Sequence, residues 1–515
     1  MTVTRLDGLT TWHTEDWRDL RVAILGLGAT GFAVADTLAE LGARCLVVAE
    51  RADEERAAIL DVLDVPVVVA ARDAVPAELD ELAPQLVIVS PGYHPDHPLL
   101  LELQRRDVPI WGDIELAWRL RDKVEPADWI CITGTNGKTT TTRLTGHLLR
   151  AAGLRVAEVG NIGVPVLDAI RHPDGFDVLA VELSSYQLHW MPIEGAGAVH
   201  PLASVCLNID DDHLDWHGSR SAYEAAKRRV YANTRIACCY NRADAATMRM
   251  VEDADVEEGC RAIGFGLDAP GPSDLGIIDG ILVDRAFLED RHRTALELTT
   301  IEELRAAGIS SPHLVADVLA AAALARAIGV STGTIHDALP GFRIDPHRTA
   351  PVAEAAGIAW IDDSKATNPH AADAALTAYP SVVWILGGLL KGVDLAPLVA
   401  RHAARLRAAV VIGSDRQPVL DVLARHAPGV PILEAIPGED GEVMPEAVRL
   451  AAGAARAGDT VLLSPAAASM DQFVDYADRG RKYAAAVLEH LGSSSEGTGH
   501  DDGTTPHPDD PSGPA

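Results

Sequence analysis

Short apolar runs alternate with longer stretches rich in Ala and Leu over most of the chain. A run of strand length that is apolar throughout is typical of a strand buried on both faces of a parallel sheet, and the stretches between the runs favour helices. This alternation predicts a doubly wound α/β fold with more strands than one sheet comfortably holds. The runs are RVAIL at 21–25, CLVVA at 45–49, QLVIVS at 85–90, DWICIT at 128–133, DVLAVEL at 177–183, ASVCLNI at 203–209, IAWID at 358–362, SVVWIL at 381–386, AAVVIG at 408–413 and DTVLLS at 459–464.

Length and turn residues predict how these elements are divided into domains. At about 100 to 200 residues per domain, the 515 residues correspond to roughly three domains. Turn residues interrupt the pattern near 123–126 and near 340–342, so we expect domains at 1–122, 123–341 and 342–491. Residues 492–515 contain Gly, Ser, Thr, Pro, His and carboxylates with Ala515 as the only apolar residue, which predicts a disordered acidic tail.

The charge and the cysteine content of the chain exclude some classes of binding partner. The formal net charge is -31, so the chain as a whole repels nucleic acid and anionic membranes, and neither is expected as a partner. The start of the chain has no apolar core of signal-peptide length, and no segment has 18 uninterrupted apolar residues. We therefore expect a cytoplasmic protein without membrane insertion. The six cysteines form no CxxC pair, which favours reduced thiols over disulfides or a structural zinc.

The first strand runs into a glycine-rich turn. Gly26, Gly28 and Gly31 form a GxGxxG pattern between the run at 21–25 and a helix expected to end near Leu41, and Glu50 ends the next run. This pattern lets a pyrophosphate approach the positive end of a helix. Taken alone it indicates a nicotinamide-dependent oxidoreductase, but it also occurs in proteins that bind other diphosphates.

A second glycine-rich turn is more specific. Residues 130–132 predict a strand, and 134–140 read GTNGKTT before a helix. A Lys and a hydroxyl residue after a glycine turn place backbone N–H groups and one cation on nucleotide phosphates, with Thr139 available to Mg²⁺. Only six of the 44 Lys and Arg residues are lysines, and Lys138 is one of them. We therefore favour a nucleotide site over simple helix capping, although Ile132 stands where the usual loop has its first glycine.

Three further residues have the chemistry of a metal-assisted site. Glu182 ends a predicted strand, where its carboxylate suits the Mg²⁺ of ATP. His213 lies in an acidic loop after the strand that Asn208 is expected to end. Lys227 stands beside two arginines on a predicted helix, and a Lys in a chain that prefers Arg indicates a chemical need for an amine.

Together these segments resemble the Mur ligase family of ATP-dependent amino-acid-adding enzymes of peptidoglycan synthesis, from about residue 21 to residue 491. The short phosphate loop is that family's own form, and the C-terminal segments are similar to those of the members that add D-glutamate. The matching segments are TGTNGKTT at 133–140, NIG at 161–163, ELSSYQL at 182–188, DHLDWHG at 212–218, AAKRRVY at 225–231, HR at 347–348, DDSKATNP at 362–369, LGGLLKG at 386–392 and LSPAAASMDQF at 463–473.

The resemblance implies an α/β enzyme with a Rossmann-like domain for the UDP substrate, a central P-loop-type domain for ATP and a Rossmann-like C-terminal domain for the amino acid. It implies a monomer that joins D-glutamate to UDP-N-acetylmuramoyl-L-alanine through an acyl phosphate. The implied cofactors are ATP and two Mg²⁺ ions, with Lys227 carbamylated as a metal ligand.

The resemblance implies five sets of functional residues in this sequence. The catalytic set is Lys138, Lys227, His213 and Glu182, and the metal set is Thr139, Glu182, His213 and Lys227. The ATP set is Gly134, Thr135, Asn136, Gly137, Lys138, Thr139, Thr140, Asp317, Arg348 and Asp363. The UDP-substrate set is Ala29, Thr30, Glu50, Arg51, Ser90, Gly92, Asn161 and Ser184, and the D-glutamate set is Lys365, Thr367, Lys391, Ser469 and Tyr476.

One helix departs from the family pattern. The family's HNxxN motif, which reaches adenine, is here His313, Leu314 and Asp317 without either Asn. Asp317 is left as the residue that could accept from the adenine amine. A folylpolyglutamate-synthase-like ligase is disfavoured because a GxGxxG domain precedes the ATP loop. An oxidoreductase would leave Lys138 and Lys227 without a role, and the intact catalytic set argues against an inactive binding protein.

Overall fold

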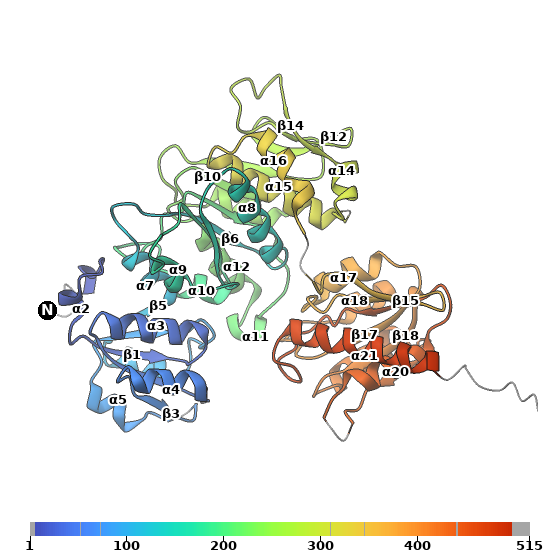
Figure 1. Cartoon of the computed structure of the whole chain (residues 1–515), viewed down its shortest axis with the longest axis horizontal. Coiled ribbons are helices and arrows are strands. Elements are labelled where there is room, and N and C mark those ends of the chain that lie inside the picture. Colours follow the sequence, from blue (N-terminus) through green and yellow to red (C-terminus); the bar gives the residue numbers. More distant parts are fainter. Residues whose placement is uncertain are drawn as a thin grey trace, which may run out of the picture. The chain divides into compact units, whose positions relative to one another are not determined.

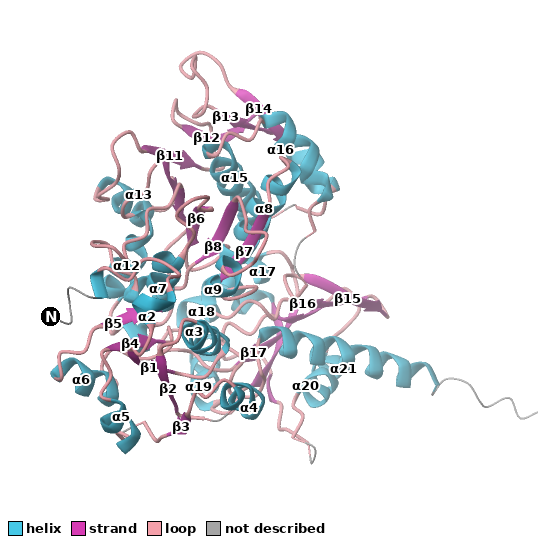
Figure 2. Cartoon of the chain, turned by 60° about the vertical axis from the view of Figure 1, so that its left-hand side comes forward, coloured by secondary structure: helices cyan, strands magenta, loops and turns pink. Residues whose placement is uncertain are grey.

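The chain forms two compact units, Met1–Ile344 and Asp345–Ala515 (Figure 1). The structure, a computed structural model, describes residues 6–51, 53–72, 74–309, 311–343, 346–438 and 441–496. Unit 1 contains two sheets and unit 2 contains one. Helices flank the strands in each, as the alternating pattern predicts (Figure 2). The expected α/β class is confirmed.

The N-terminal sheet of unit 1 has five parallel strands in the order β3-β2-β1-β4-β5. Strands β2 and β3 lie on one side of β1, and β4 and β5 lie on its other side. The loops that follow β1 and β4 therefore lie side by side. The strands are β1 Arg21–Leu25, β2 Arg44–Ala49, β3 Val67–Val69, β4 Leu86–Val89 and β5 Ile110–Gly112. The helices are α2 Thr14–Trp17, α3 Ala29–Glu40, α4 Glu54–Val62, α5 Ala77–Leu82, α6 Pro98–Arg105 and α7 Asp113–Leu120.

The central sheet of unit 1 has nine strands in the order β14-β13-β12-β11-β10-β9-β6-β8-β7. Strand β6 lies between β9 and β8, so the loops after these three strands meet at one edge. The strands are β6 Asp128–Thr133, β7 Val156–Gly160, β8 Val178–Glu182, β9 Ala203–Cys206, β10 Ala237–Asn241, β11 Arg261–Phe265, β12 Asp274–Ile278, β13 Ile281–Asp284 and β14 Leu296–Thr300.

The last strands of the central sheet depart from the parallel arrangement that the sequence predicts. Strand β13 pairs antiparallel with β12 and with β14, and the register shifts at Leu282/Val283. The turn Asp279–Gly280, in which both residues have positive φ, joins β12 directly to β13. These strands are short and partly polar, so no long apolar run marks them in the sequence.

One helix of the central sheet is largely buried. Helix α15 has ten buried residues; it lies beside α8 and packs against strands β9, β10 and β11. The helices are α8 Lys138–Ala151, α9 Val166–Ile170, α10 Ser185–Trp190, α11 Leu214–His217, α12 Arg220–Arg228, η1 Arg229–Tyr231, α13 Ala245–Glu252, α14 Ile301–Ala306, α15 Pro312–Ala327, α16 Thr332–Ala338 and η2 Leu339–Gly341.

Unit 2 is a six-stranded sheet in the order β15-β16-β20-β17-β18-β19, in which β15 alone is antiparallel to its neighbour. The strands are β15 Ala350–Ala355, β16 Ile358–Asp362, β17 Val382–Gly387, β18 Leu406–Ile412, β19 Ile432–Glu434 and β20 Thr460–Leu463. The helices are α17 Pro369–Thr377, α18 Ala396–His402, η3 Ala403–Arg405, α19 Gln417–His426, α20 Met444–Ala454 and α21 Tyr476–Glu496.

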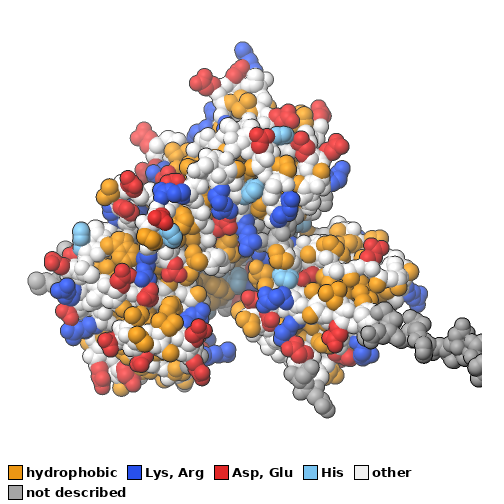
Figure 3. All heavy atoms as spheres, in the orientation of Figure 1, with side chains coloured by type: hydrophobic (Ala, Val, Ile, Leu, Met, Phe, Trp, Pro, Cys, Tyr) orange, Lys and Arg blue, Asp and Glu red, His pale blue; other side chains and the backbone are white. Residues whose placement is uncertain are grey.

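The C-terminal boundary differs from the expectation. Helix α21 continues to Glu496, whereas the tail was expected to begin at Gly492, because the backbone hydrogen bonds of a helix can extend past its last buried contact. Residues 497–515 of the expected tail lie outside the described part of the chain. No helix in the described ranges combines the length and apolarity needed to cross a membrane. Figure 3 shows acidic and basic side chains interspersed on the visible face.

A buried carboxyl group joins the two sheets of unit 1. Asp113 opens α7, is 7% exposed, and accepts a hydrogen bond from Nε2 of Gln187 on α10 at 3.2 Å. Burial raises the pKa of Asp113 to about 6. Because the folded-state pKa lies above the ordinary value, the proton on Asp113 stabilises the fold at low pH, and this contribution is lost as pH rises through about 6.

We expect Asp113→Asn to raise the melting temperature at pH 7.5 and to raise it less at pH 4.5. A shift of two pKa units corresponds to about 3 kcal/mol at most, so the gain at pH 7.5 should be on the order of 1 to 3 kcal/mol. Thermal unfolding at the two pH values measures the difference. Asp122→Asn is the control, and it should change the melting temperature at pH 7.5 in the opposite direction. Backbone N–H groups hold the pKa of the exposed Asp122 below its ordinary value, so its ionised form stabilises the fold. An Asp113→Asn protein that is less stable at pH 7.5 than the parent would contradict the interpretation.

Candidate functional site

The predicted phosphate loop lies between β6 and α8. Gly134 has φ of +151° and Gly137, the residue before the first turn of α8, has φ of +83°. The free N–H groups at the start of this 14-residue helix lie beside the loop, where they suit an anion. Thr139 and Thr140 are buried in the first turn of α8, and Asp317 of α15 lies so close to Gly137 that a Cβ there would be 2.4 Å from its Oδ1.

Two residues from neighbouring elements hold the loop in shape. Asn208 forms a pair with Asn136: it accepts from the Asn136 N–H at 2.8 Å and donates to the Asn136 carbonyl at 3.1 Å. The hydroxyl of Tyr223 on α12 is 2.9 Å from Oγ1 of Thr135. The sequence expectation that Asn208 ends a strand is wrong by two residues, since β9 ends at Cys206 and Asn208 turns toward the loop.

Two lysines share one acceptor in the loop. Nζ of Lys138 and Nζ of Lys227 each donate to the carbonyl oxygen of Gly134 at 2.8 Å. Lys227 is 1% exposed, and Nζ also lies 3.3 Å from Oγ1 of Thr133. Burial first, and the charge of Lys138 second, lower the pKa of Lys227 to about 7. The amine of Lys227 is therefore available in its neutral, nucleophilic form near neutral pH.

A buried carboxylate lies on the neighbouring strand. Glu182 ends β8 and is 1% exposed; its Oε1 accepts from Nδ2 of Asn161 at 2.8 Å. Its Oε2 is buried and has no hydrogen-bond donor among the described residues. An unsatisfied carboxylate oxygen at this depth fits a cation.

His213 lies at the same edge of the sheet. It has φ of +54°, and its Nδ1 is within hydrogen-bond distance of the Tyr186 hydroxyl, while its Nε2 faces Asp212 at 3.6 Å. Across the described ranges, no group of three or more His, Cys, Asp and Glu side chains converges as a metal site. A site built from Glu182 and His213 would therefore need other oxygen ligands, such as the Thr139 hydroxyl.

Six of the eight predicted UDP-substrate residues lie at the carboxyl end of the N-terminal sheet, and Asn161 and Ser184 follow strands of the central sheet. Ala29 and Thr30 begin α3 after the glycine turn, and Ser90 follows β4 with its buried Oγ lacking a partner among the described residues. A Cβ at Gly26 would lie 2.6 Å from that Oγ, so the two loops are in contact. Glu50 follows β2 and lies 3.2 Å from Nε2 of His97.

The remaining UDP-substrate residues differ in environment. Arg51 is exposed next to Glu50, and Ser184 is the N-cap of α10, where it forms a capping box with Gln187. The carbonyl of Gly92 accepts from Nε1 of Trp216, which links the N-terminal sheet to the loop of His213. The structure thus brings the phosphate loop, the metal candidates and Gly92 to one side of unit 1.

In unit 2 the predicted D-glutamate residues lie in three adjacent loops. Strand β20 lies between β16 and β17, so the loops carrying Lys365, Ser469 and Lys391 emerge at one edge of the sheet. Leu389 and Ala468 exchange backbone hydrogen bonds of 3.0 and 2.9 Å, which ties two of these loops together. Nζ of Lys365 lies 4.9 Å from the ring centroid of Tyr476, and Thr367 lies beside Lys365 with its N–H bonded to the Lys365 carbonyl.

Two residues predicted to contact ATP also lie in unit 2. Asp363 is buried and accepts from Oγ of Ser464 at 2.8 Å and from the N–H of Thr349 at 3.1 Å. Burial raises the pKa of Asp363 to about 7. Arg348 is partly buried nearby, and its charge opposes that rise.

Sequence reasoning missed Arg479, which is 0% exposed. Its guanidinium donates to Oγ and the carbonyl of Ser364 at 2.9 and 2.7 Å and to the carbonyl of Ala467 at 3.1 Å. It therefore connects the loop of Lys365 to the loop of Ser469. Nothing in the local pattern marks Arg479, because an Arg on a C-terminal helix is ordinarily exposed.

Fold and site together define a class: α/β enzymes in which a parallel sheet presents a lysine-containing phosphate loop, with buried acidic and basic side chains beside it. Family models match three ranges of the chain. They are described as the Mur ligase MurD-like N-terminal domain at residues 20–112, the Mur ligase middle domain at 132–325 and the Mur ligase glutamate ligase domain at 347–467.

Curated relatives cover nearly the whole chain. A protein of Leifsonia xyli subsp. xyli named UDP-N-acetylmuramoylalanine–D-glutamate ligase is 62% identical over 97% of both chains. Proteins of the same name are 50% identical in Streptomyces avermitilis, over 92% of this chain and 98% of the relative, and 43% identical in Mycobacterium avium, over 90% and 96%. The chain belongs to the Mur ligase family, whose members are ATP-dependent ligases.

Solved structures share the fold at lower identity. UDP-N-acetylmuramate-alanine ligase MurC from Thermotoga maritima has a TM-score of 0.52 and 20% identity, over 92% of this chain and 99% of that one. MurF from Acinetobacter baumannii has a TM-score of 0.53 and 16% identity, over 92% of both chains.

We expect Gly137→Ala to abolish ATP-dependent turnover and Gly153→Ala to preserve it. Both glycines flank α8 with similar φ, +83° and +86°, so each substitution costs about 1 kcal/mol of backbone strain. Only at Gly137 would the new Cβ meet another group, Oδ1 of Asp317 at 2.4 Å, whereas at Gly153 nothing lies within 4 Å. Phosphate release should fall about 100-fold or more in Gly137→Ala, corresponding to about 2.7 kcal/mol. Equal turnover of the two variants would show that the loop tolerates the displacement.

Proposed function

We propose that this chain is the ligase that joins D-glutamate to UDP-N-acetylmuramoyl-L-alanine in peptidoglycan precursor synthesis, with hydrolysis of ATP to ADP and phosphate. The observation that carries the proposal is the pair Lys138–Lys227 on the carbonyl of Gly134, in a chain 62% identical to a relative of that name. The cation of Lys138 on a phosphate loop suits a reaction in which negative charge is bound and moved, and Lys227 places a modifiable amine beside it.

The proposed chemistry proceeds in two stages. The carboxylate of the UDP substrate attacks the γ-phosphorus of ATP, forming an acyl phosphate and ADP. The amine of D-glutamate then adds to the acyl carbon, loses a proton, and phosphate leaves. Lys138 and the N–H groups at the start of α8 would neutralise the phosphoryl oxygens, and exclusion of water would protect the acyl phosphate.

Metal ions complete the proposed site. Thr139 and the unsatisfied Oε2 of Glu182 would hold one Mg²⁺, and His213 would hold the second. Bound Mg²⁺ would offset phosphate charge. The neutral amine of Lys227 can add to CO₂, forming an N–C bond and releasing a proton, and the resulting carbamate would add carboxylate oxygens to the one that Glu182 offers.

The other assignments are parts of the same proposal. The boundaries 1–122, 123–341 and 342–491 would separate the UDP-substrate, ATP and amino-acid domains. We propose that the enzyme acts as a monomer in the cytoplasm, where its UDP-linked substrate and ATP are available. In unit 2, Lys365 and Lys391 would face the two carboxylates of D-glutamate, with Thr367, Ser469 and Tyr476 beside them.

D-Glutamate should be the amino acid that supports phosphate release. With UDP-N-acetylmuramoyl-L-alanine and ATP present, we expect release with D-glutamate to exceed that with L-glutamate, L-alanine or diaminopimelate by at least about 100-fold, since two cations match two carboxylates of one stereochemistry. A colorimetric phosphate assay measures this. Equal or faster release with any of the other amino acids would refute the proposed acceptor.

Lys227→Arg should abolish turnover, although arginine is a cation as a protonated lysine is. An arginine cannot form the carbamate, so we expect kcat to fall by more than about 100-fold at saturating substrates and Mg²⁺. Arg228→Lys, a neighbour with its side chain half exposed, should stay within about twofold of the parent and serves as the matched control. The parent, unlike Lys227→Arg, should also show a carbamate signal by NMR after incubation with ¹³C-bicarbonate. Retention of kcat within about tenfold, or about 1.4 kcal/mol, would discard the carbamate.

A further inference from the structure

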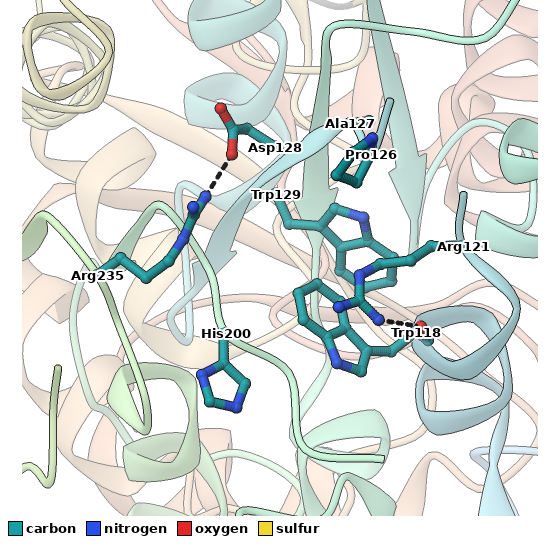
Figure 4. A pocket seen from close by; sticks show the side chains of 8 residues that line it. All are labelled: Trp118, Arg121, Pro126, Ala127, Asp128, Trp129, His200 and Arg235. Atoms are coloured by element: carbon teal, nitrogen blue, oxygen red, sulfur yellow. Dashed lines mark hydrogen bonds and ion pairs between the residues drawn. The ribbon is translucent and has the colours of Figure 1, made fainter. Parts of the chain in front are cut away.

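A cavity of about 320 Å³ opens in unit 1 where α7 passes into β6 (Figure 4). Its wall includes Trp118 from the end of α7, Arg121 and Pro126 from the connection, and Asp128 and Trp129 from the start of β6. His200 and Arg235, which precede β9 and β10, complete it. The size matches the lower end of small-molecule sites in proteins.

This cavity is separate from the phosphate loop. It lies at the amino end of β6, whereas the loop follows the carboxyl end of the same strand. The six residues of β6 span about 20 Å at about 3.3 Å per residue. None of the residues assigned above to ATP, the metal ions, the UDP substrate or D-glutamate lines the cavity.

Aromatic rings form much of the wall. Trp118 meets Trp129 edge to face at 5.2 Å between centroids, and its ring is nearly parallel to that of His200, with 13° between the planes. The guanidinium of Arg121 lies over the Trp118 ring at 3.5 Å. Figure 4 shows these groups around one opening, with Arg235 and Asp128 on its other side. Such a wall favours a flat apolar group.

The charges of the wall do not balance. Arg235 is paired with Asp128, but Arg121 has no carboxylate partner among the described residues and donates only to the Trp118 carbonyl, at 2.6 Å. Asp128 is the one carboxylate in the lining, and Glu257, outside it, pairs with His200. Burial first, and the charge of Arg235 second, lower the pKa of Arg121 to about 10. The chain has a net charge of -31, yet this partly buried guanidinium has no carboxylate beside it. Its positive charge is therefore available to an anionic ligand.

A second donor in the wall is also unsatisfied. Trp129 is 1% exposed, and its Nε1 has no acceptor among the described residues. Because this N–H is enclosed by protein, the guanidinium of Arg121 is the donor that a ligand can reach. One unmatched positive charge calls for a monoanion, because a dianion would leave an excess negative charge beside Asp128.

We propose that this cavity binds a small aromatic carboxylate, with the carboxylate on Arg121 and the ring at the edge of the Trp118–His200 pair, whose centroids, 6.2 Å apart, leave no room for a third ring between them. A planar carboxylate matches a guanidinium in a bidentate geometry that a point charge does not use. Because the wall combines the last helix of the N-terminal sheet with the first strand of the central sheet, a ligand there would bridge these two parts of unit 1.

Calorimetric titration of the full-length protein tests the proposal, with benzoate and indole-3-acetate as probes. We expect one-to-one binding with Kd no weaker than about 1 mM. Acetate, which lacks the ring, and benzyl alcohol, which lacks the charge, should bind at least tenfold more weakly. Saturating ADP and Mg²⁺ should leave benzoate binding unchanged, since the nucleotide loop is at the opposite end of β6.

Substitutions of single arginines test whether benzoate binds in this cavity. Arg121→Gln should weaken benzoate binding at least tenfold, and Arg235→Gln should weaken it because Asp128 would lose its partner. Arg155→Gln is the matched control: Arg155 is exposed and paired with Asp177 at the start of β7, outside the cavity, as Arg235 is paired with Asp128. Arg155→Gln should bind as the parent does.

Four results would overturn the proposal. They are absence of saturable binding of either probe, equal binding of acetate, competition by ADP, and parent-like affinity in Arg121→Gln. If Arg121→Gln fails to fold, the comparison of Arg235→Gln with Arg155→Gln tests the site instead, because both of these side chains are about half exposed. Equal affinity of these two variants for benzoate would reject the site.

Discussion

The amines of two lysines share the carbonyl oxygen of Gly134, and the candidate site of the central sheet is built around this contact. Lys138 arrives from the helix that follows the loop, and Lys227 arrives from α12, 89 residues further along the chain. Burying an amine is costly unless its donors are satisfied. The loop satisfies them by directing a carbonyl inward, which the backbone of Gly134 at φ of +151° permits. The same contact ties both lysines to the loop, and burial, followed by the charge of Lys138, lowers the pKa of Lys227.

Each of the three sheets presents its chemistry in the same way. Parallel strands end at one edge, and the loops there carry Ser90 and Glu50, then Glu182 and His213, then Lys365 and Lys391. Apolar runs predict such strands well because both faces are buried, and residues that directly follow a run are placed by topology. This is why the phosphate loop lies where a predicted strand ends, whereas most other candidate residues come from the family resemblance and stay predictions.

What the sequence could not predict depends on contacts between distant segments. The antiparallel extension β12–β14 has strands of only four or five residues without a long apolar run, and the turn Asp279–Gly280 is its one local signal in the sequence. Asn208 and Tyr223 act on the loop across 72 and 88 residues, and Arg479 spans 115 residues to Ser364. Local periodicity contains no information on such pairs. The end of α21 at Glu496 likewise depends on how far helical hydrogen bonding continues past the last packed residue.

The outermost strands have a consequence for how copies of the chain meet one another. An unpaired strand edge invites another chain to extend the sheet. Here β3, β5 and β19 are three residues each, too short to offer a useful ladder. Strand β15 has Pro351 and a register shift, β14 pairs through a register shift, and β7 carries Glu158, bonded to Arg150. Each outermost strand among the described residues is thus a poor template for a further strand, which disfavours aggregation through the sheet edges.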